Sequence, residues 1–170
     1  FYEDMKKWSF HLNVFFLGHR AQQHLNLAEM KESAIIDRSI YEDAEIFARA
    51  SKALGNISDR DFDTYQTVFN MVVKNLPVPD LLIFLYAPVD TLLERINARG
   101  REMEKGMPRE YLGLLDSLYE KWLQRFDLCP VLTIRSDNLD FVNKPEHLRI
   151  IIQRIHERLS GKEEVFFPDS

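Results

Sequence analysis

The stretch Asp80–Tyr86, with the sequence DLLIFLY, decides the fold. Its apolar residues stand at consecutive positions, a pattern typical of a strand with both faces covered. A helix is predicted directly after it, from Asp90 to Arg99, where Gly100 interrupts the pattern. A strand followed at once by a helix is part of a βαβ unit, so the sequence favours a mainly parallel sheet with helices on both faces.

The same signals divide the rest of the chain into helices and strands. Residues 4–31 predict a long helix that is apolar on nearly all sides, and such a helix is expected to be buried. The β-branched run from Ser33 to Ile36 predicts a strand that ends at a charged turn. Further elements are expected at 41–54, at 58–76 with Ser58 as N-cap, at 108–127 and at 145–159 as helices, and at 131–134 as a strand. We therefore expect one helix-rich α/β domain spanning residues 1–170.

Composition excludes several classes of protein. Hydrophobic residues make up 45% of the 170 residues and charged residues 29%, which is a globular balance. The formal net charge of −5 argues against a nucleic acid polymer as partner. No apolar stretch approaches the roughly 20 residues of a membrane span. The single Cys129 excludes an internal disulfide and indicates a reducing compartment, which we expect to be the cytoplasm.

Charged residues follow the predicted strand at 33–36. Asp37 and Arg38 stand where that strand ends, and ligands of parallel sheets lie beyond the carboxyl ends of the strands. An acid there can hold Mg²⁺ through water, and the neighbouring guanidinium can face a phosphate. The alternative is an ordinary charged turn with a surface ion pair.

A second cationic group follows the strongest predicted strand. Arg95 and Arg99 are four residues apart on one helix face, and Arg101 follows Gly100. Three guanidiniums around a glycine suit a lid that closes on phosphates. The alternative is a solvated helix end, where cations are favoured by the helix dipole and neutralised by nearby acids. Those acids are Glu94, Glu102 and Glu104.

Polar and aromatic residues also share the first predicted helix. Asn13 and Arg20 are seven residues apart and lie nearly on one line, with Phe16 between them. An amide, a ring and a guanidinium can stack on a nucleobase and bond its edge. Asp43 and Phe47 are one turn apart on the next helix. Alternatively, Asn13 is a satisfied core amide and Arg20 a surface residue with a buried stem.

Taken together, these segments resemble the deoxynucleoside kinase family, which includes the deoxycytidine, deoxyguanosine and deoxyadenosine kinases. The resemblance extends over essentially the whole chain, in order and spacing. The residues that carry it are Tyr2, Trp8-Ser9-Phe10, Arg20, Asp37 to Asp43, Ile46-Phe47-Ala48, Arg95, Arg99-Gly100-Arg101, Glu104, Gly106-Met107-Pro108, Tyr111-Leu112 and Asp140-Phe141. It implies a P-loop-kinase-like fold, ATP and Mg²⁺ as cofactors, and a homodimer formed through long helices.

The resemblance also implies a role for individual residues. For the deoxynucleoside, Tyr2 and Glu104 would hold the 3′-hydroxyl. The base would be framed by Asn13, Phe16 and Phe47 and its edge read by Arg20 and Asp43. For phosphoryl transfer, Arg38 would sit near the 5′-oxygen and Asp37 would contribute to the Mg²⁺ site. The lid on the ATP phosphates would be Arg95, Arg99 and Arg101, and the adenine of ATP would touch Asp140 and Phe141.

The oppositely charged pair of Arg20 and Asp43 resembles the pair carried by the branch of the family that accepts purines and cytosine. The chain as a whole looks most like the bacterial deoxyadenosine and deoxyguanosine kinases. A thymidylate-kinase-like monophosphate kinase, or a non-catalytic dimerisation remnant of the fold, is the alternative.

Two departures from the family stand out. Position 13 carries Asn where the family has Gln, so the amide is one methylene shorter. No GxxxxGK[ST] motif occurs, because in this family the first strand, the phosphate loop and the general base precede position 1. We therefore expect that an N-terminal segment is absent from this chain, and that the 170 residues alone are inactive and unstable.

Overall fold

A computed structural model describes residues 4–104, 106–137, 139–141 and 143–161 of the chain. The chain divides into two compact units. The first comprises residues 1–77 and 110–125, and the second comprises residues 78–109 and 126–170.

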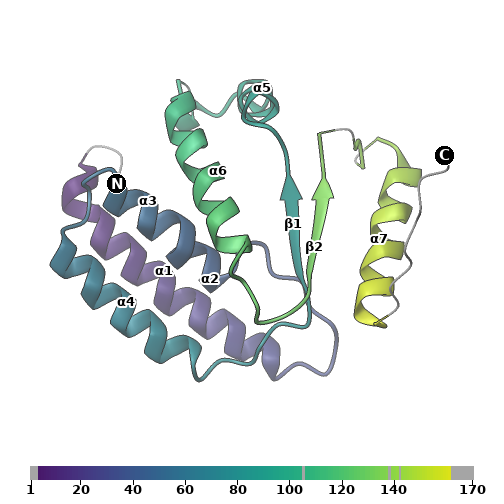
Figure 1. The fold of residues 1–170 in the computed structure, drawn as a ribbon, viewed down its shortest axis with the longest axis horizontal. Coiled ribbons are helices and arrows are strands. Elements are labelled where there is room, and N and C mark those ends of the chain that lie inside the picture. The colour runs from purple at the N-terminus through teal and green to yellow at the C-terminus, as the bar shows by residue number, and fades with distance from the viewer. Residues whose placement is uncertain (1–3, 105, 138, 142, 162–170) are drawn as a thin grey trace. The chain divides into compact units, whose positions relative to one another are not determined.

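The first unit is built from helices. They are α1 (Met5–Ala28), α2 (Ile40–Glu42), the π-helix η1 (Asp43–Ala48), α3 (Arg49–Ala53), α4 (Asp59–Val73) and α6 (Arg109–Leu123). Figure 1 shows α1, α3 and α4 lying side by side. The predicted cap is confirmed, since the Ser58 hydroxyl accepts a hydrogen bond from the Asp61 amide at 3.1 Å at the start of α4.

The elements α2, η1 and α3 follow one another without a break, and η1 packs against both α1 and α4. The side chains of Ala44, Ile46 and Ala48 are fully buried, and the ring of Tyr41 meets Phe69 of α4 edge to face at 6.4 Å. The π-helical geometry of η1 is rare and occurs frequently at functional sites. The predicted helix at 41–54 is confirmed, but its π-helical segment was not predicted.

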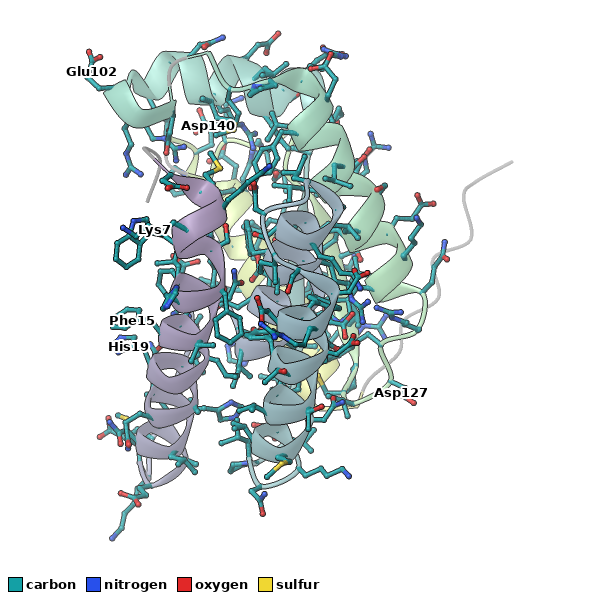
Figure 2. All side chains as sticks on the ribbon, turned by 90° about the vertical axis from the view of Figure 1, so that its left-hand side faces the viewer. Lys7, Phe15, His19, Glu102, Asp127 and Asp140 are labelled. Carbon is teal, nitrogen blue, oxygen red and sulfur yellow. The ribbon has the colours of Figure 1, made fainter. Side chains whose placement is uncertain are left out.

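Only one face of α1 is buried. Ser9, Asn13 and Leu17 point into the unit, whereas the side chains of Trp8 and Phe15 are 45% and 63% exposed. Figure 2 shows Phe15 pointing away from the helices against which α1 packs. The prediction of a helix buried on all sides is wrong for the described residues, because only the inward face meets η1 and α4.

The second unit contains the sheet. Strands β1 (Leu82–Tyr86) and β2 (Val131–Arg135) pair in parallel, from Leu82 opposite Val131 to Tyr86 opposite Arg135. Helix α5 (Val89–Arg99) follows β1 and ends where Gly100 adopts a left-handed conformation with φ of 66°. The short 3₁₀ turn η2 (Glu102–Glu104) comes next, and α7 (Pro145–Leu159) packs on β2 (Figure 1). The predicted parallel pairing is confirmed.

Two expectations about strands are wrong. Residues 33–36 form no strand, and Ile35 is 88% exposed. A β-branched run becomes a strand only where a neighbour accepts its backbone hydrogen bonds, and in the described parts of the chain only β1 and β2 pair. Strand β1 is half-buried, with Leu85 51% exposed, so its faces are not both covered by the described residues. None of the described helices is both long and apolar enough to cross a membrane.

Candidate functional site

In the first unit, the guanidinium of Arg20 joins three elements. It donates to the Asp43 carboxylate of η1 at 3.3 Å and to the Gln23 side-chain oxygen at 3.0 Å. A third hydrogen bond reaches the main-chain oxygen of Asp37 at 3.2 Å, in the turn before α2. The structure therefore brings together Arg20 and Asp43, as the sequence predicts, and holds the guanidinium by three hydrogen bonds.

Asp43 is a buried acid whose charge is only partly compensated. Its side chain is 9% exposed, and burial raises the pKa of its carboxyl above the ordinary value. The hydrogen bond and positive charge of Arg20, and the more distant charge of Arg38, oppose that rise without cancelling it. A perturbed acid paired with one cation is typical of functional sites.

The turn ahead of α2 holds Arg38 in a strained conformation. Arg38 has a φ of 65°, which costs a residue other than glycine roughly 1–3 kcal/mol. Its guanidinium lies over the ring of Phe47 with 4.4 Å to the centroid. Ser39 then caps α2 by accepting from the Glu42 amide at 3.1 Å. The turn thus brings two predicted site residues, Arg38 and Phe47, into contact.

Two other predicted residues of α1 differ in their surroundings. Asn13 is buried, and its amide nitrogen donates to the Ser9 main-chain oxygen at 2.8 Å. Phe16 is 38% exposed, and its ring meets Phe15 edge to face at 5.6 Å. Asn13 therefore shares the inward face with Leu17, while Phe16 lies at the edge of that face.

In the second unit, the three predicted lid arginines fall into two groups. Arg99 and Arg101 both form ion pairs with Glu104, at 2.6 Å and 3.6 Å. The carboxylate predicted to hold the sugar is therefore paired with two of the predicted lid arginines. Arg95 instead bonds Ser136, which follows β2, through its side-chain oxygen at 3.2 Å and its main-chain oxygen at 2.6 Å.

A hollow in the second unit, of about 580 Å³, is lined by Arg95 together with Asp140 and Phe141. The Asp140 amide donates to the His147 ring nitrogen at 3.0 Å, which ties this loop to α7. Asp140 also accepts from the Asn143 amide at 2.9 Å. The residues predicted to touch the adenine of ATP are thus positioned by α7 beside one of the predicted phosphate ligands.

The chemistry of Asp37 fits a magnesium ion that is bound mainly by substrate. Its side chain is exposed, and no three His, Cys, Asp or Glu residues gather as a metal site in the described ranges. Mg²⁺ needs no such cage, since it is usually held by one or two carboxylates, phosphate oxygens and water. Tyr2, the other predicted sugar ligand, lies outside the described residues.

Two residues at these sites were not predicted. Gln23 is three residues after Arg20, a spacing that places both side chains on one face of a helix and could have indicated the contact. Ser136 stands directly after β2, where ligands of parallel sheets are expected, but a lone serine carries no motif.

Comparison with known proteins identifies the class. The sequence model of the deoxynucleoside kinase family matches residues 1–160, and the chain belongs to that family. It is 38% identical over 157 residues to the deoxyadenosine/deoxycytidine kinase of Bacillus subtilis, covering 91% of this chain and 72% of the relative. It is 33% identical to the deoxyadenosine kinase of Lactobacillus acidophilus, covering 94% of this chain and 77% of the relative.

Solved structures agree with this assignment. The deoxyadenosine kinase of M. mycoides with bound dATP superposes with a TM-score of 0.77 at 28% identity, covering 91% of this chain and 78% of that one. The predicted helix-rich, P-loop-kinase-like α/β fold and the kinase class are confirmed. None of these comparisons supports a thymidylate-kinase-like enzyme or a non-catalytic remnant.

The Arg20→Ala variant tests the electrostatics of the pair. Arg20 lowers the pKa of Asp43 against the effect of burial, so its removal should raise that pKa further. A carbon-detected NMR titration of the Asp43 carboxyl measures the change. Arg60→Ala removes an exposed arginine of α4 and should leave this pKa as it is. An unchanged or lower pKa in Arg20→Ala would contradict the described contact.

Proposed function

We propose that the chain's own substrate is a deoxynucleoside with an adenine or cytosine base, which receives the γ-phosphate of ATP on its 5′-hydroxyl. The observation that carries this proposal is the contact of Arg20 with the buried Asp43. Support comes from the relatives, which are named as deoxyadenosine, deoxyguanosine and deoxyadenosine/deoxycytidine kinases. We place the reaction in the cytoplasm, where a single unpaired thiol such as Cys129 stays reduced.

The direction of hydrogen bonding favours these bases. A guanidinium only donates and an ionised carboxylate only accepts. Adenine presents an amino donor beside a ring-nitrogen acceptor, and cytosine likewise presents an amino group, so both complement Arg20 and Asp43. Guanine presents two acceptors on the edge that includes N7 and O6. That edge offers no donor to the Asp43 carboxylate, which favours adenine over guanine for this pair.

The remaining predicted residues of the first unit act on the base, the reacting oxygen and the Mg²⁺ site. Asn13, Phe16 and Phe47 frame the base, and Arg38 approaches the 5′-oxygen, where it stabilises developing negative charge. For that step its guanidinium leaves the Phe47 ring that it covers in this structure. Asp37 would hold Mg²⁺ together with phosphate oxygens and water, and the bound ion would supply neutralisation of charge on the ATP phosphates.

The second unit acts on the phosphate donor. Arg95, Arg99 and Arg101 bind the ATP phosphates, and Asp140 with Phe141 contacts the adenine of ATP. Glu104 holds the sugar 3′-hydroxyl with Tyr2. Since Glu104 also pairs with Arg99 and Arg101 here, binding of the nucleoside loosens these ion pairs and frees both guanidiniums for phosphate.

The reaction is tested with the protein at its natural length and Mg-ATP. Initial rates with deoxyadenosine, deoxycytidine, deoxyguanosine and thymidine should give the highest kcat/KM for deoxyadenosine or deoxycytidine and a poor value for thymidine. The matching monophosphates serve as controls and should not be turned over. Turnover of monophosphates alone, or equal use of thymidine, would overturn the proposal.

We further propose a homodimer that buries the outer face of α1. The residues Met5, Trp8, Leu12, Phe15 and His19 recur every three or four positions, which is the spacing of a helix–helix seam. Trp8, Leu12 and Phe15 surround a hollow of about 290 Å³ together with His11, and the Phe15 and His19 rings stack at 6.0 Å. An apolar stripe of this kind is self-complementary about a two-fold axis, which favours a second copy of the chain as its partner.

Phe15→Glu tests the dimer. A carboxylate in the centre of the seam would be buried without a partner, so the variant should sediment as a monomer where the parent protein sediments as a dimer. Leu54→Glu is the matched control, because Leu54 is 50% exposed at the end of α3 and outside the seam. A Phe15→Glu protein that stays dimeric would exclude this face as the interface.

A further inference from the structure

Ser136 closes the ladder between the two strands. Its amide donates to the Tyr86 main-chain oxygen at 2.8 Å, and its hydroxyl donates to the same oxygen at 3.0 Å. The residue is 3% exposed and follows β2 directly, as Tyr86 ends β1. Ser136 is therefore held at the carboxyl end of the sheet by main-chain and side-chain bonds together.

Ser136 in turn holds Arg95. One guanidinium nitrogen donates to its hydroxyl oxygen at 3.2 Å and the other to its main-chain oxygen at 2.6 Å. The hydroxyl accepts from Arg95 while it donates to Tyr86, so it links the guanidinium to both strands. A planar guanidinium fits such a two-pronged contact, whereas the ammonium of lysine does not.

Among the described residues, the other two arginines of the predicted lid have no such anchor. The side chains of Arg99 and Arg101 are 48% and 61% exposed, and their described partner is Glu104, which lies five and three residues further along the chain. These pairs can form and break without disturbing the sheet. Arg95 is exposed as well, but its guanidinium makes two hydrogen bonds to Ser136 at the end of the sheet.

We propose that Ser136 is a positioning residue that presets Arg95 as a fixed phosphate-binding group, with Arg99 and Arg101 as the movable part of the lid. This inference rests on the proposed role of Arg95 toward ATP. The hollow lined by Arg95, Asp140, Phe141 and Lys144 is where the donor nucleotide would meet the preset guanidinium. Because the Arg95 guanidinium would be oriented before ATP binds, no binding free energy would be lost in ordering it.

Ser136→Ala removes the hydroxyl but keeps both main-chain contacts. Loss of one hydrogen bond to a charged group corresponds to about a tenfold change, so KM for ATP should rise about tenfold while KM for the deoxynucleoside stays constant. Arg95→Ala should raise KM for ATP at least as much, and adding Ser136→Ala to it should have no further effect. Thr133→Ala, which removes an exposed hydroxyl of β2, is the matched control and should behave as the parent protein.

Arg95→Lys provides a second variant that leaves Ser136 in place. It keeps the charge and loses the two-pronged contact, so KM for ATP should again rise about tenfold. A wild-type KM for ATP in Arg95→Lys would overturn the positioning role. So would a Ser136→Ala protein whose KM values for ATP and for the deoxynucleoside rise equally and whose melting temperature falls. If Arg95→Ala leaves KM for ATP unchanged, the proposed role of Arg95 fails and this inference with it. If Arg95→Ala raises KM for ATP but Ser136→Ala leaves it unchanged, the role of Arg95 stands and the positioning role fails.

Discussion

A guanidinium of α1 and a carboxylate of η1 meet at 3.3 Å, and this contact joins the two elements within the first unit. Burial makes the Asp43 charge costly, so the carboxylate needs Arg20 close by, and Arg20 is held there by Gln23 and the Asp37 main chain. The π-helical turns that carry Asp43 also carry Phe47. One ion pair therefore links the inner face of α1, the strained turn at Arg38 and the proposed base-reading edge.

In the second unit, the arginine side chains are held in two different ways. Arg95 is tied to the ends of both strands through Ser136, whereas Arg99 and Arg101 share a nearby acid. Fixed charges cost no reorganisation during reaction, and locally paired ones can be released when substrate arrives. One anchored guanidinium and two locally paired ones fit an enzyme that first binds ATP and then encloses it.

Sequence reasoning succeeded where a single residue determines a boundary. The Ser58 cap, the helix end at Gly100 and the helix that begins at Pro145 were all predicted correctly from local chemistry. It failed at residues 33–36 because strand formation depends on a neighbour that local pattern does not reveal. It also misjudged α1, since an aromatic stripe that faces outward has the composition of a buried one. The contact of Gln23 could have been inferred from its helical spacing to Arg20, whereas the contact of Ser136 depends on the folded arrangement and has no motif. The roles assigned to the site residues remain predictions.

The coupling between Arg20 and Asp43 in nucleoside binding tests the central claim most directly. Calorimetric Kd values for deoxyadenosine would be measured for the parent protein, Arg20→Ala, Asp43→Ala and the double variant. If the pair reads the base as a unit, each single change should weaken binding at least about tenfold, and the double variant should bind no more weakly than the worse single variant. Additive losses, or single variants that bind as tightly as the parent, would contradict the account.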